Sequence, residues 1–321
     1  MNAVAPTVTV VLPAYNGSAT IRMAIDSIRE QTYQDWEMVI VDDASTDGTP
    51  RILEEYASLD RRIRVFYHPR NLGVSMAMNR GITQALGEFI AVQEQDDFST
   101  PLRLEREVAV LENDPGVGLV SGIADWLDNE LHHQTYFPGI LANGGRYPSN
   151  REAMFQFLYL EQCKIVNAGC MFRREAVRHY PEPYGRRRVC GDWSLFMRIA
   201  REWRIEGLPE VVVRMRRGNK RDSVTTDKQM QFREARRVIT QFYREFRASG
   251  EPRLNRALWR RSMSNELILE ARTFGRFGGL VRLAQAALLS PGNPTVWRAA
   301  KHWGARAAGK LSLASTGSTK I

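Results

Sequence analysis

The sequence predicts an α/β fold, with a mostly parallel sheet flanked by helices and a helical C-terminal extension. In the first two thirds of the chain, short apolar runs typical of strands alternate with amphipathic helix-like runs, as in parallel sheets wound by right-handed crossovers. From residue 227 onward the pattern is helical and rich in arginine. With 321 residues, of which 43% are hydrophobic, the chain is long enough for about two domains. We expect them at residues 1–225 and 226–321.

The first third of the chain predicts three successive strand–helix units and a fourth strand. Strand-like apolar runs lie at residues 7–12, 38–41, 63–67 and 89–93. Each of the first three is followed by apolar residues at helical spacing, within residues 21–28, 52–57 and 76–85. The Ser and Thr residues before the first of these helices are typical caps.

Beyond the fourth strand the pattern is less regular. Helices are expected at residues 101–111, 151–162 and 192–202, and strands at residues 117–122, 168–172 and 211–215. Residues 128–150 are rich in Gly, Pro, Asn and His, which indicates an irregular excursion and a candidate substrate loop. The last residues, 312–321, are typical of a disordered end.

Three of the strand-like runs end in polar loops, two of which carry acids. The carboxyl ends of parallel strands converge on one edge of a sheet, where ligands bind. The sequence therefore predicts a ligand crevice at this edge. The residues that we expect there are Pro13, Tyr15 and Asn16 after the first strand, Asp42 and Asp43 after the second, and Glu94, Asp96 and Asp97 after the fourth.

The acidic loop formed by Glu94, Asp96 and Asp97 is a candidate metal site. Carboxylates crowded at a strand end repel one another unless a cation neutralises them. Mg²⁺ or Mn²⁺ bound by one or two carboxylates usually completes its shell with ligand phosphates, which makes a nucleotide diphosphate the natural co-ligand. The alternative is a solvated turn before a helix cap, since residues 99–101 are themselves a helix-start signal.

The other candidates each have an ordinary structural alternative. Asp42 and Asp43 suit recognition of a base or ribose, with Tyr15 against the base, but they also suit an Asx-turn or a cap. Asp192 begins a predicted helix, where a carboxylate serves as an N-cap or as a base for an acceptor hydroxyl. The basic loop 214–221 suits a diphosphate clamp, a solvated turn or a nucleic-acid patch. It has no interleaved aromatics, so we expect no nucleic-acid partner.

The net charge of +9 belongs to the C-terminal region. Residues 226–321 hold 18 Lys plus Arg against 6 Asp plus Glu, or +12, which leaves 27 against 30, or −3, for residues 1–225. The cysteines are odd in number and lack metal-ligand spacing, so reduced thiols in a cytoplasm are expected. No apolar stretch approaches the roughly 18 to 20 residues that span a bilayer, and no secretory leader pattern is present.

The basic C-terminal region also carries apolar side chains, among them Trp259, Trp297 and Trp303. Basic residues and interfacial tryptophans both bind the face of an anionic membrane. A helical extension that packs on the first domain and leaves its arginines solvated explains the pattern equally well.

Six motifs follow one another in order at residues 8–16, 41–49, 71–73 with 79–82, 94–97, 167–174 and 191–198. Together they resemble the family 2 glycosyltransferases, which have the Rossmann-like GT-A fold, and in particular the type that builds bacterial cell-surface polysaccharides. The resemblance covers residues 6–221, about two thirds of the chain.

The resemblance implies roles for the candidate residues. In that family the end of the first strand and the Asp–Asp pair bind the nucleotide, which here implies Pro13, Tyr15, Asn16, Asp42 and Asp43. An Asp-x-Asp-type motif binds the metal and the donor diphosphate, which implies Asp96 and Asp97, with Glu94 at the first position and Mn²⁺ or Mg²⁺ as the ion.

Two positions depart from the family pattern. The family's catalytic base is the Asp of a Glu–Asp pair, which implies Asp192, with Gly191 in place of the Glu. Many members have a His after the strand that corresponds to residues 211–215. This chain has Arg216 after that strand. The resemblance therefore implies that Arg216 contacts the phosphate directly.

The family is inverting, which implies a single displacement. Asp192 would deprotonate an acceptor hydroxyl, whose oxygen attacks the anomeric carbon of a nucleotide-sugar, with UDP as the expected nucleotide. The metal and nearby arginines would stabilise the departing diphosphate. With the basic region at a membrane, the acceptor would be a glycan or a lipid-linked molecule in surface polysaccharide synthesis, and the protein would be peripheral at the inner face of the cell membrane.

Other functions fit the sequence less well. A nucleotidyltransferase would use a similar crevice and metal, but it usually has a Gly-rich basic loop after the first strand, where residues 13–18 contain no Lys or Arg. A non-catalytic nucleotide-sugar-binding protein would need Asp96 and Asp97 but not Asp192. A dinucleotide-dependent oxidoreductase is disfavoured because no Gly-x-Gly-x-x-Gly follows the first strand.

Overall fold

The computed structural model describes residues 5–162, 164–216, 227–250, 254–274 and 276–302. The chain divides into two compact units, one formed by residues 1–158 and 162–226, the other by residues 159–161 and 227–321. Cys163, the basic loop beyond Arg216 and the expected disordered end at residues 312–321 lie outside the described residues.

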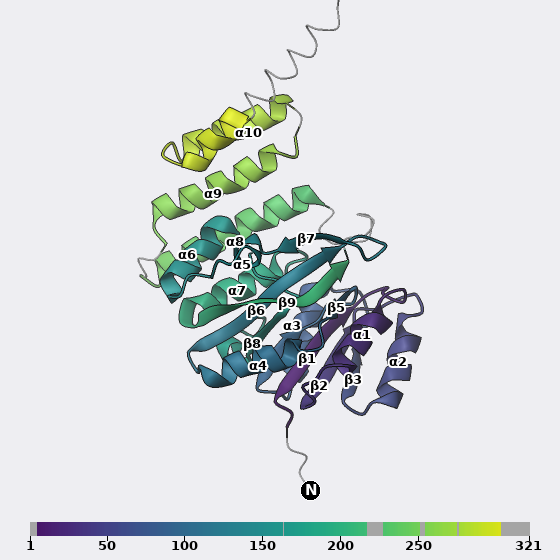
Figure 1. The fold of residues 1–321 in the computed structure, drawn as a ribbon. Coiled ribbons are helices and arrows are strands. Elements are labelled where there is room, and N and C mark those ends of the chain that lie inside the picture. The colour runs from purple at the N-terminus through teal and green to yellow at the C-terminus, as the bar shows by residue number, and fades with distance from the viewer. Residues whose placement is uncertain (1–4, 163, 217–226, 251–253, 275, 303–321) are drawn as a thin grey trace, which may run out of the picture. The chain divides into compact units, whose positions relative to one another are not determined.

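Within the described part of the chain, the first unit is built on a nine-stranded sheet in the order β3-β2-β1-β4-β8-β6-β9-β5, with β7 paired to β6 (Figure 1). The strands are β1 (Val8–Ala14), β2 (Trp36–Asp42), β3 (Ile63–Tyr67), β4 (Phe89–Val92), β5 (Asp97–Ser99), β6 (Val117–Leu127), β7 (His133–Phe137), β8 (Cys170–Arg173) and β9 (Arg204–Arg216).

The N-terminal half of the sheet is parallel, as predicted. β2 pairs with β3 and β1, and β1 with β4, all in parallel. In this register Ala14 lies opposite Asp42, and Val11 lies opposite Val92. The carboxyl ends of β1, β2 and β4 therefore lie along one edge. β8 joins antiparallel to both β4 and β6, so the sheet is mixed beyond this point.

Helices pack on both faces of the parallel strands, as β2 illustrates. Met38 and Ile40 belong to the large core cluster that includes the buried faces of α1 (Ile21–Arg29), α2 (Thr49–Leu59) and α4 (Arg103–Asn113). The alternate residues Val39 and Val41 pack with Ala77 of α3 (Val74–Gln84). A strand that is buried on both faces reads as a continuous apolar run, which is the pattern that the sequence shows.

Several element boundaries differ from those predicted. β6 extends to Leu127, past the expected end at residue 122, and β9 begins at Arg204, before the expected start at residue 211. Residues 128–150 include β7 and the short α5 (Gly139–Ala142). α6 (Arg151–Glu161) and α7 (Gly191–Glu202) lie where helices were expected. The N-cap of α7 is Cys190, with a left-handed φ of 63°, so Asp192 lies in the first turn and is not the cap. The left-handed backbone at a cysteine could not be read from the sequence.

The second unit is helical, as predicted. It contains α8 (Lys228–Ala248), α9 (Arg256–Ala271) and α10 (Arg276–Leu289), followed by helical residues 294–302. Asp227 and Asn255 cap α8 and α9 through their side chains, an arrangement that satisfies the first free N–H groups of a helix. None of the helices in the described ranges combines the length and apolarity that a bilayer crossing requires.

Candidate functional site

The loops that follow β1 and β2 are joined by side-chain-to-backbone hydrogen bonds. Asn16, with a left-handed φ of 47°, accepts a hydrogen bond from Thr46 N at its Oδ1 (2.8 Å), and its own N–H donates to Ser45 Oγ (2.9 Å). The buried Asp42 accepts from both the N–H and the hydroxyl of Ser45, at 3.1 and 2.5 Å. Pro13 is buried within β1, opposite Val41 in β2.

Asp43 connects the end of β2 to the loop before α3. Its carboxylate accepts hydrogen bonds from Leu72 N (2.8 Å) and Gly73 N (2.7 Å), and His68 Nδ1 lies 2.7 Å from Oδ1. Gly73 has a φ of 92°, which glycine adopts without strain. Asp43 and His68 are both buried. These contacts give Asp43 a structural role, and its contact with a nucleotide stays a prediction.

Gln95 links the end of β1 to the acidic loop, a role that the sequence did not reveal. Its Oε1 accepts from Tyr15 N (2.8 Å) and its Nε2 donates to Tyr15 O (3.0 Å). This paired contact leaves the Tyr15 side chain 44% exposed. Gly17 makes the contact possible, because a Cβ at that position would lie 2.4 Å from Gln95 Oε1.

The carboxylates of Glu94, Asp96 and Asp97 converge at the carboxyl end of β4. One oxygen from each lies within 4.8 Å of the others. Asp96 is exposed, Glu94 is half-buried and Asp97 is buried, so the cluster opens to solvent on one side. Asp97 Oδ1 also accepts from the backbone N–H of Arg216 (3.2 Å), which places the end of β9 beside the cluster. The structure thus brings together the residues predicted to hold the metal.

A chain of hydrogen bonds connects this cluster to the loop before α7. Asn167 Nδ2 donates to Glu94 Oε1 (2.9 Å), and Tyr184 Oη donates to Asn167 Oδ1 (2.9 Å). Asn79, on α3, accepts from Tyr184 N (2.9 Å) and donates to Gly185 O (2.9 Å). The partners are far apart in the sequence, so no local pattern could have identified the chain.

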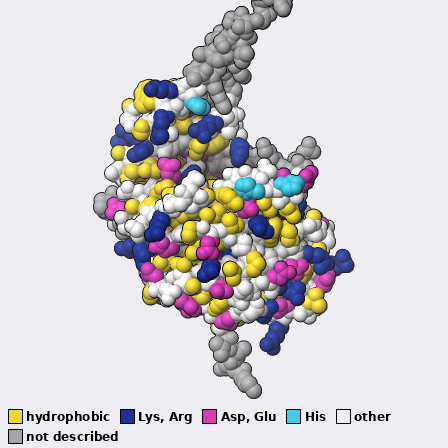
Figure 2. Space-filling view, in the orientation of Figure 1, with side chains coloured by type: hydrophobic (Ala, Val, Ile, Leu, Met, Phe, Trp, Pro, Cys, Tyr) yellow, Lys and Arg dark blue, Asp and Glu magenta, His cyan; other side chains and the backbone are white. Residues whose placement is uncertain are grey.

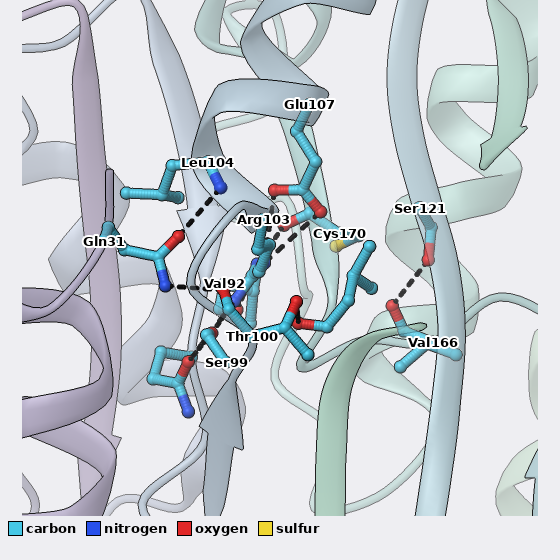
Figure 3. Close-up of polar contacts among 12 residues, drawn as sticks. Gln31, Val92, Ser99, Thr100, Arg103, Leu104, Glu107, Ser121, Val166 and Cys170 are labelled. Carbon is cyan, nitrogen blue, oxygen red and sulfur yellow. Dashed lines mark hydrogen bonds and ion pairs between the residues drawn. The ribbon is translucent and has the colours of Figure 1, made fainter. Parts of the chain in front are cut away.

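A buried arginine donates hydrogen bonds to the ends of β4 and β8 (Figure 3). Arg103, on α4, donates from Nη2 to Val92 O (2.8 Å) and Cys170 O (3.1 Å), the adjacent ends of β4 and β8. Its Nε lies 3.2 Å from Glu107 one turn later, and both side chains are fully buried. Burial raises the pKa of Glu107 to about 7, although Arg103 opposes the shift.

Arg103 also reaches the acidic loop through two neutral side chains. Its Nη1 donates to Ser99 Oγ (2.8 Å), and Ser99 in turn donates to Gln93 Oε1 (2.7 Å). Gln93 Nε2 then donates to Asp97 O (2.8 Å) and Glu94 O (3.1 Å). This buried hydrogen-bond network fixes the backbone that carries the carboxylates, because its side chains have few other conformations available.

Asp192 lies in the first turn of α7. Burial raises the pKa of the Cys170 thiol, and the carboxylates of Glu107, Asp192 and Glu94 raise it further. The charges of Asp192 and Glu94 thus act on the same buried thiol, while the charge of Arg103 opposes them. Gly191 lies where a Cβ would be 2.4 Å from the Ser75 hydroxyl oxygen, so the start of α7 approaches the start of α3 closely. A larger residue at Gly191 would have to displace this contact.

The family model described as glycosyl transferase family 2 matches residues 9–180. The putative glycosyltransferase EpsE of Bacillus subtilis is 42% identical over 108 residues, which are 33% of this chain and 39% of that protein. The putative teichuronic acid biosynthesis glycosyltransferase TuaG of the same organism is 39% identical over 103 residues, 32% of this chain and 41% of that protein. These alignments thus span about two fifths of each relative.

Solved structures resemble the fold over most of the chain. TarS of S. aureus in complex with UDP-GlcNAc has a TM-score of 0.61 at 18% identity, over 89% of this chain and 82% of that one. The mannosyltransferase PcManGT of Pyrobaculum calidifontis, in complex with GDP-Man and Mn²⁺, has a TM-score of 0.54 at 21% identity, over 96% of this chain and 87% of that one. At such identities the likeness concerns the fold, and it confirms the GT-A fold that the sequence predicts.

Proposed function

The chain belongs to glycosyl transferase family 2, and we propose that it moves a sugar from a nucleotide-diphosphate sugar, with UDP as the nucleotide, to an acceptor hydroxyl with inversion at the anomeric carbon. The observation that carries the proposal is the convergence of Glu94, Asp96 and Asp97 at the sheet edge where β1 and β2 also end. We assign the catalytic role to residues 1–225 and membrane contact to residues 226–321.

The acidic cluster has the chemistry of a divalent-cation site. Hard cations such as Mn²⁺ and Mg²⁺ prefer carboxylate oxygens, and three of these come within 4.8 Å of one another. We propose that Asp96 and Asp97, with Glu94, hold the ion and that Asp96 also faces the donor. A bound ion would supply charge neutralisation for the departing diphosphate.

The remaining chemistry falls to protein groups. Asp192 removes the proton from the acceptor hydroxyl, and the oxygen forms the new bond to the anomeric carbon as the bond to the diphosphate breaks. Arg216 adds positive charge beside the leaving group. Pro13, Tyr15, Asn16, Asp42 and Asp43 form the nucleotide side of the site in this proposal. Hydrogen bonds already fix the loops that contain these last residues, so little ordering would accompany donor binding.

Similar proteins support the donor and acceptor classes. TarS was solved with UDP and with UDP-GlcNAc, and PcManGT with GDP-Man and Mn²⁺. TuaG is named for teichuronic acid biosynthesis. We therefore propose a glycan or lipid-linked acceptor in surface polysaccharide synthesis, and action in the cytoplasm at the inner face of the membrane.

Incubation of the full chain with a panel of nucleotide-sugars, Mn²⁺ and candidate acceptors tests the proposal. We expect diphosphate release that depends on Mn²⁺, and Asp192→Asn should lower its rate by about 10²- to 10⁴-fold, the usual contribution of a general base. Glu202→Gln, in the last turn of the same helix, is the control and should retain the rate. Release that is unchanged in Asp192→Asn would exclude this base, and no release with any donor would exclude the function.

A further inference from the structure

α10 presents apolar side chains on two opposite faces. On one face, Leu283 and Ala286 are buried in a core cluster with Ile268 of α9. On the other, Phe277 and Leu288 are exposed by 82% and 83%. Fully apolar exposed side chains of this size are ordinary when isolated, but a continuous set of them indicates a binding surface.

The exposed side chains of α10 form one continuous stripe. Phe277, Leu280, Val281 and Leu288 are all exposed, by 82%, 56%, 40% and 83%, and we call them the α10 face. Their spacing of three, four and seven residues places them on the same side of a helix. The small Ala284 fills the gap in the stripe and is exposed too. No described residue covers this side of the helix.

Arg282 and Gln285 of α10 lie beside the stripe and do not interrupt it. Arg282 donates to Gln285 Oε1 (2.8 Å) and pairs with Glu270 of α9 at 3.2 Å. Its guanidinium also lies over the Phe274 ring, 5.4 Å from the centroid. These contacts hold Arg282 against α9. The α10 face is thus apolar along the length of the helix.

From α10 onward the chain carries charge of a single sign. After Glu270 the sequence contains no Asp or Glu, but it contains eight Lys and Arg. Arg272, Arg298 and Lys301 are exposed. Trp297, beside Arg298, is 57% exposed, and its indole N–H donates to Pro291 O (3.0 Å). Figure 2 shows hydrophobic and basic side chains next to one another on the surface of the C-terminal helices.

We propose that the α10 face binds the surface of an anionic lipid bilayer, with the helix lying in the plane of the interface, and that Trp297 and the exposed basic residues of the C-terminal helices add to the binding. An apolar stripe enters the boundary between headgroups and acyl chains, while basic side chains attract anionic headgroups. A second copy of the chain fits less well, because an isologous contact would bring two positive surfaces together. The inference rests on the proposed function in one respect, which is that membrane binding would bring the enzyme to a lipid-linked acceptor.

Vesicle flotation of the full chain tests this inference. Vesicles of phosphatidylcholine with phosphatidylglycerol should carry the protein upward, and high salt or phosphatidylcholine alone should reduce this binding. The double variant Phe277→Ser, Leu288→Ser should lower the partition coefficient at least about tenfold, since two large apolar groups no longer leave water. Leu59→Ser is the matched control, because Leu59 is 66% exposed on α2, and it should bind like the wild type.

Three results would overturn the inference. The first is that the wild type does not float at low salt. The second is that the double variant floats as well as the wild type and has an unchanged circular dichroism spectrum. The third is that the wild type sediments as a dimer and the double variant as a monomer. Diphosphate release with a soluble acceptor is measured on the same samples. Release without flotation rejects the membrane surface alone, whereas flotation without release rejects the proposed reaction and leaves the surface supported.

Discussion

The two acidic corners of the sheet edge differ in what neutralises their carboxylates. At the end of β2, Asp42 and Asp43 accept hydrogen bonds from backbone N–H groups and from a serine hydroxyl of neighbouring loops. At the end of β4, Glu94, Asp96 and Asp97 approach one another within 4.8 Å. The first corner is stabilised by the protein's own donors, and the second has the arrangement that a cation stabilises.

The comparison separates structural acids from candidate functional acids by their surroundings. Both corners follow apolar strands and look alike in the sequence. Amide substitution at the first corner should therefore reduce stability in addition to the proposed nucleotide contact, and at the second corner it should reduce activity without loss of stability. The predictions below test this division.

The largest effect is expected from Asp96→Asn at the β4 corner. The amide loses the negative charge that attracts a divalent ion, so Mn²⁺-dependent transfer should fall at least about 100-fold. The midpoint of thermal unfolding should stay the same, because Asp96 is exposed. Steady-state assays over a Mn²⁺ titration measure the loss, with Glu54→Gln on α2 as an exposed acid-to-amide control. Full activity in Asp96→Asn would assign the acids a structural role.

At the β2 corner, Asp43→Asn should lower stability. An amide nitrogen cannot accept from Leu72 N or Gly73 N, so at least one of these N–H groups loses its charged acceptor, and the free energy of unfolding should fall by about 1–3 kcal/mol. Urea denaturation followed by circular dichroism measures the change. An unchanged midpoint would contradict the structural role of Asp43, and a loss of donor binding at that unchanged midpoint would leave the proposed nucleotide contact as its only role.

Beneath the β4 corner, Glu107 should make stability depend on pH. Its pKa in the folded protein is about 7, above the ordinary value of 4.5. Its stabilising contribution is therefore fully present below about pH 4.5 and is lost as the pH rises through 7. At about 1.36 kcal/mol per pKa unit, the free energy of unfolding should fall by about 3 kcal/mol. Glu107→Gln should remove this slope.

The pH series compares urea midpoints of the wild type and Glu107→Gln between pH 4.5 and pH 8. Because other groups titrate equally in both proteins, the difference between the two curves isolates Glu107. A wild-type midpoint that rises relative to the variant over this range would contradict the assignment.

The smallest effect is expected from Gly17→Ala, which tests how the β1 loop is joined to the β4 corner. The new methyl group would displace Gln95 from both of its contacts with Tyr15, and we expect a loss of about 1–2 kcal/mol in unfolding free energy. Gly48→Ala is the control, since its nearest contact would be an ordinary 3.5 Å. Equal midpoints in the two variants would show that Gln95 moves aside without cost.

The sequence predicted the parallel half of the sheet because local physics determines it. Residues 7–12, 38–41 and 89–93 are apolar on both faces, and helical spacing follows each of the first two. The antiparallel insertion of β8 between β4 and β6 has no such signal, because strand order depends on tertiary packing. The clustering of Glu94, Asp96 and Asp97 was predicted because all three follow the apolar run 89–93 directly, at the carboxyl end of a parallel strand.

The groups that hold the site in place could not be predicted. Arg103 lies within the helix predicted at residues 101–111, and its contacts with Val92 and Cys170 depend on the folded sheet. Gln95 and Asn167 lie within motifs, but neither motif predicts that Gln95 bonds to Tyr15 or that Asn167 bonds to Glu94 across 73 residues. Side-chain hydrogen bonds across such separations leave no periodicity in the chain.

Manganese binding to the full chain, followed by electron paramagnetic resonance of free Mn²⁺ with UDP present, tests most directly whether the β4 corner is a cation site. We expect saturable binding by the wild type and by Glu54→Gln, and its loss in Asp96→Asn. Binding of equal affinity in Asp96→Asn, or no binding by the wild type, would contradict the assignment of Glu94, Asp96 and Asp97 to the metal.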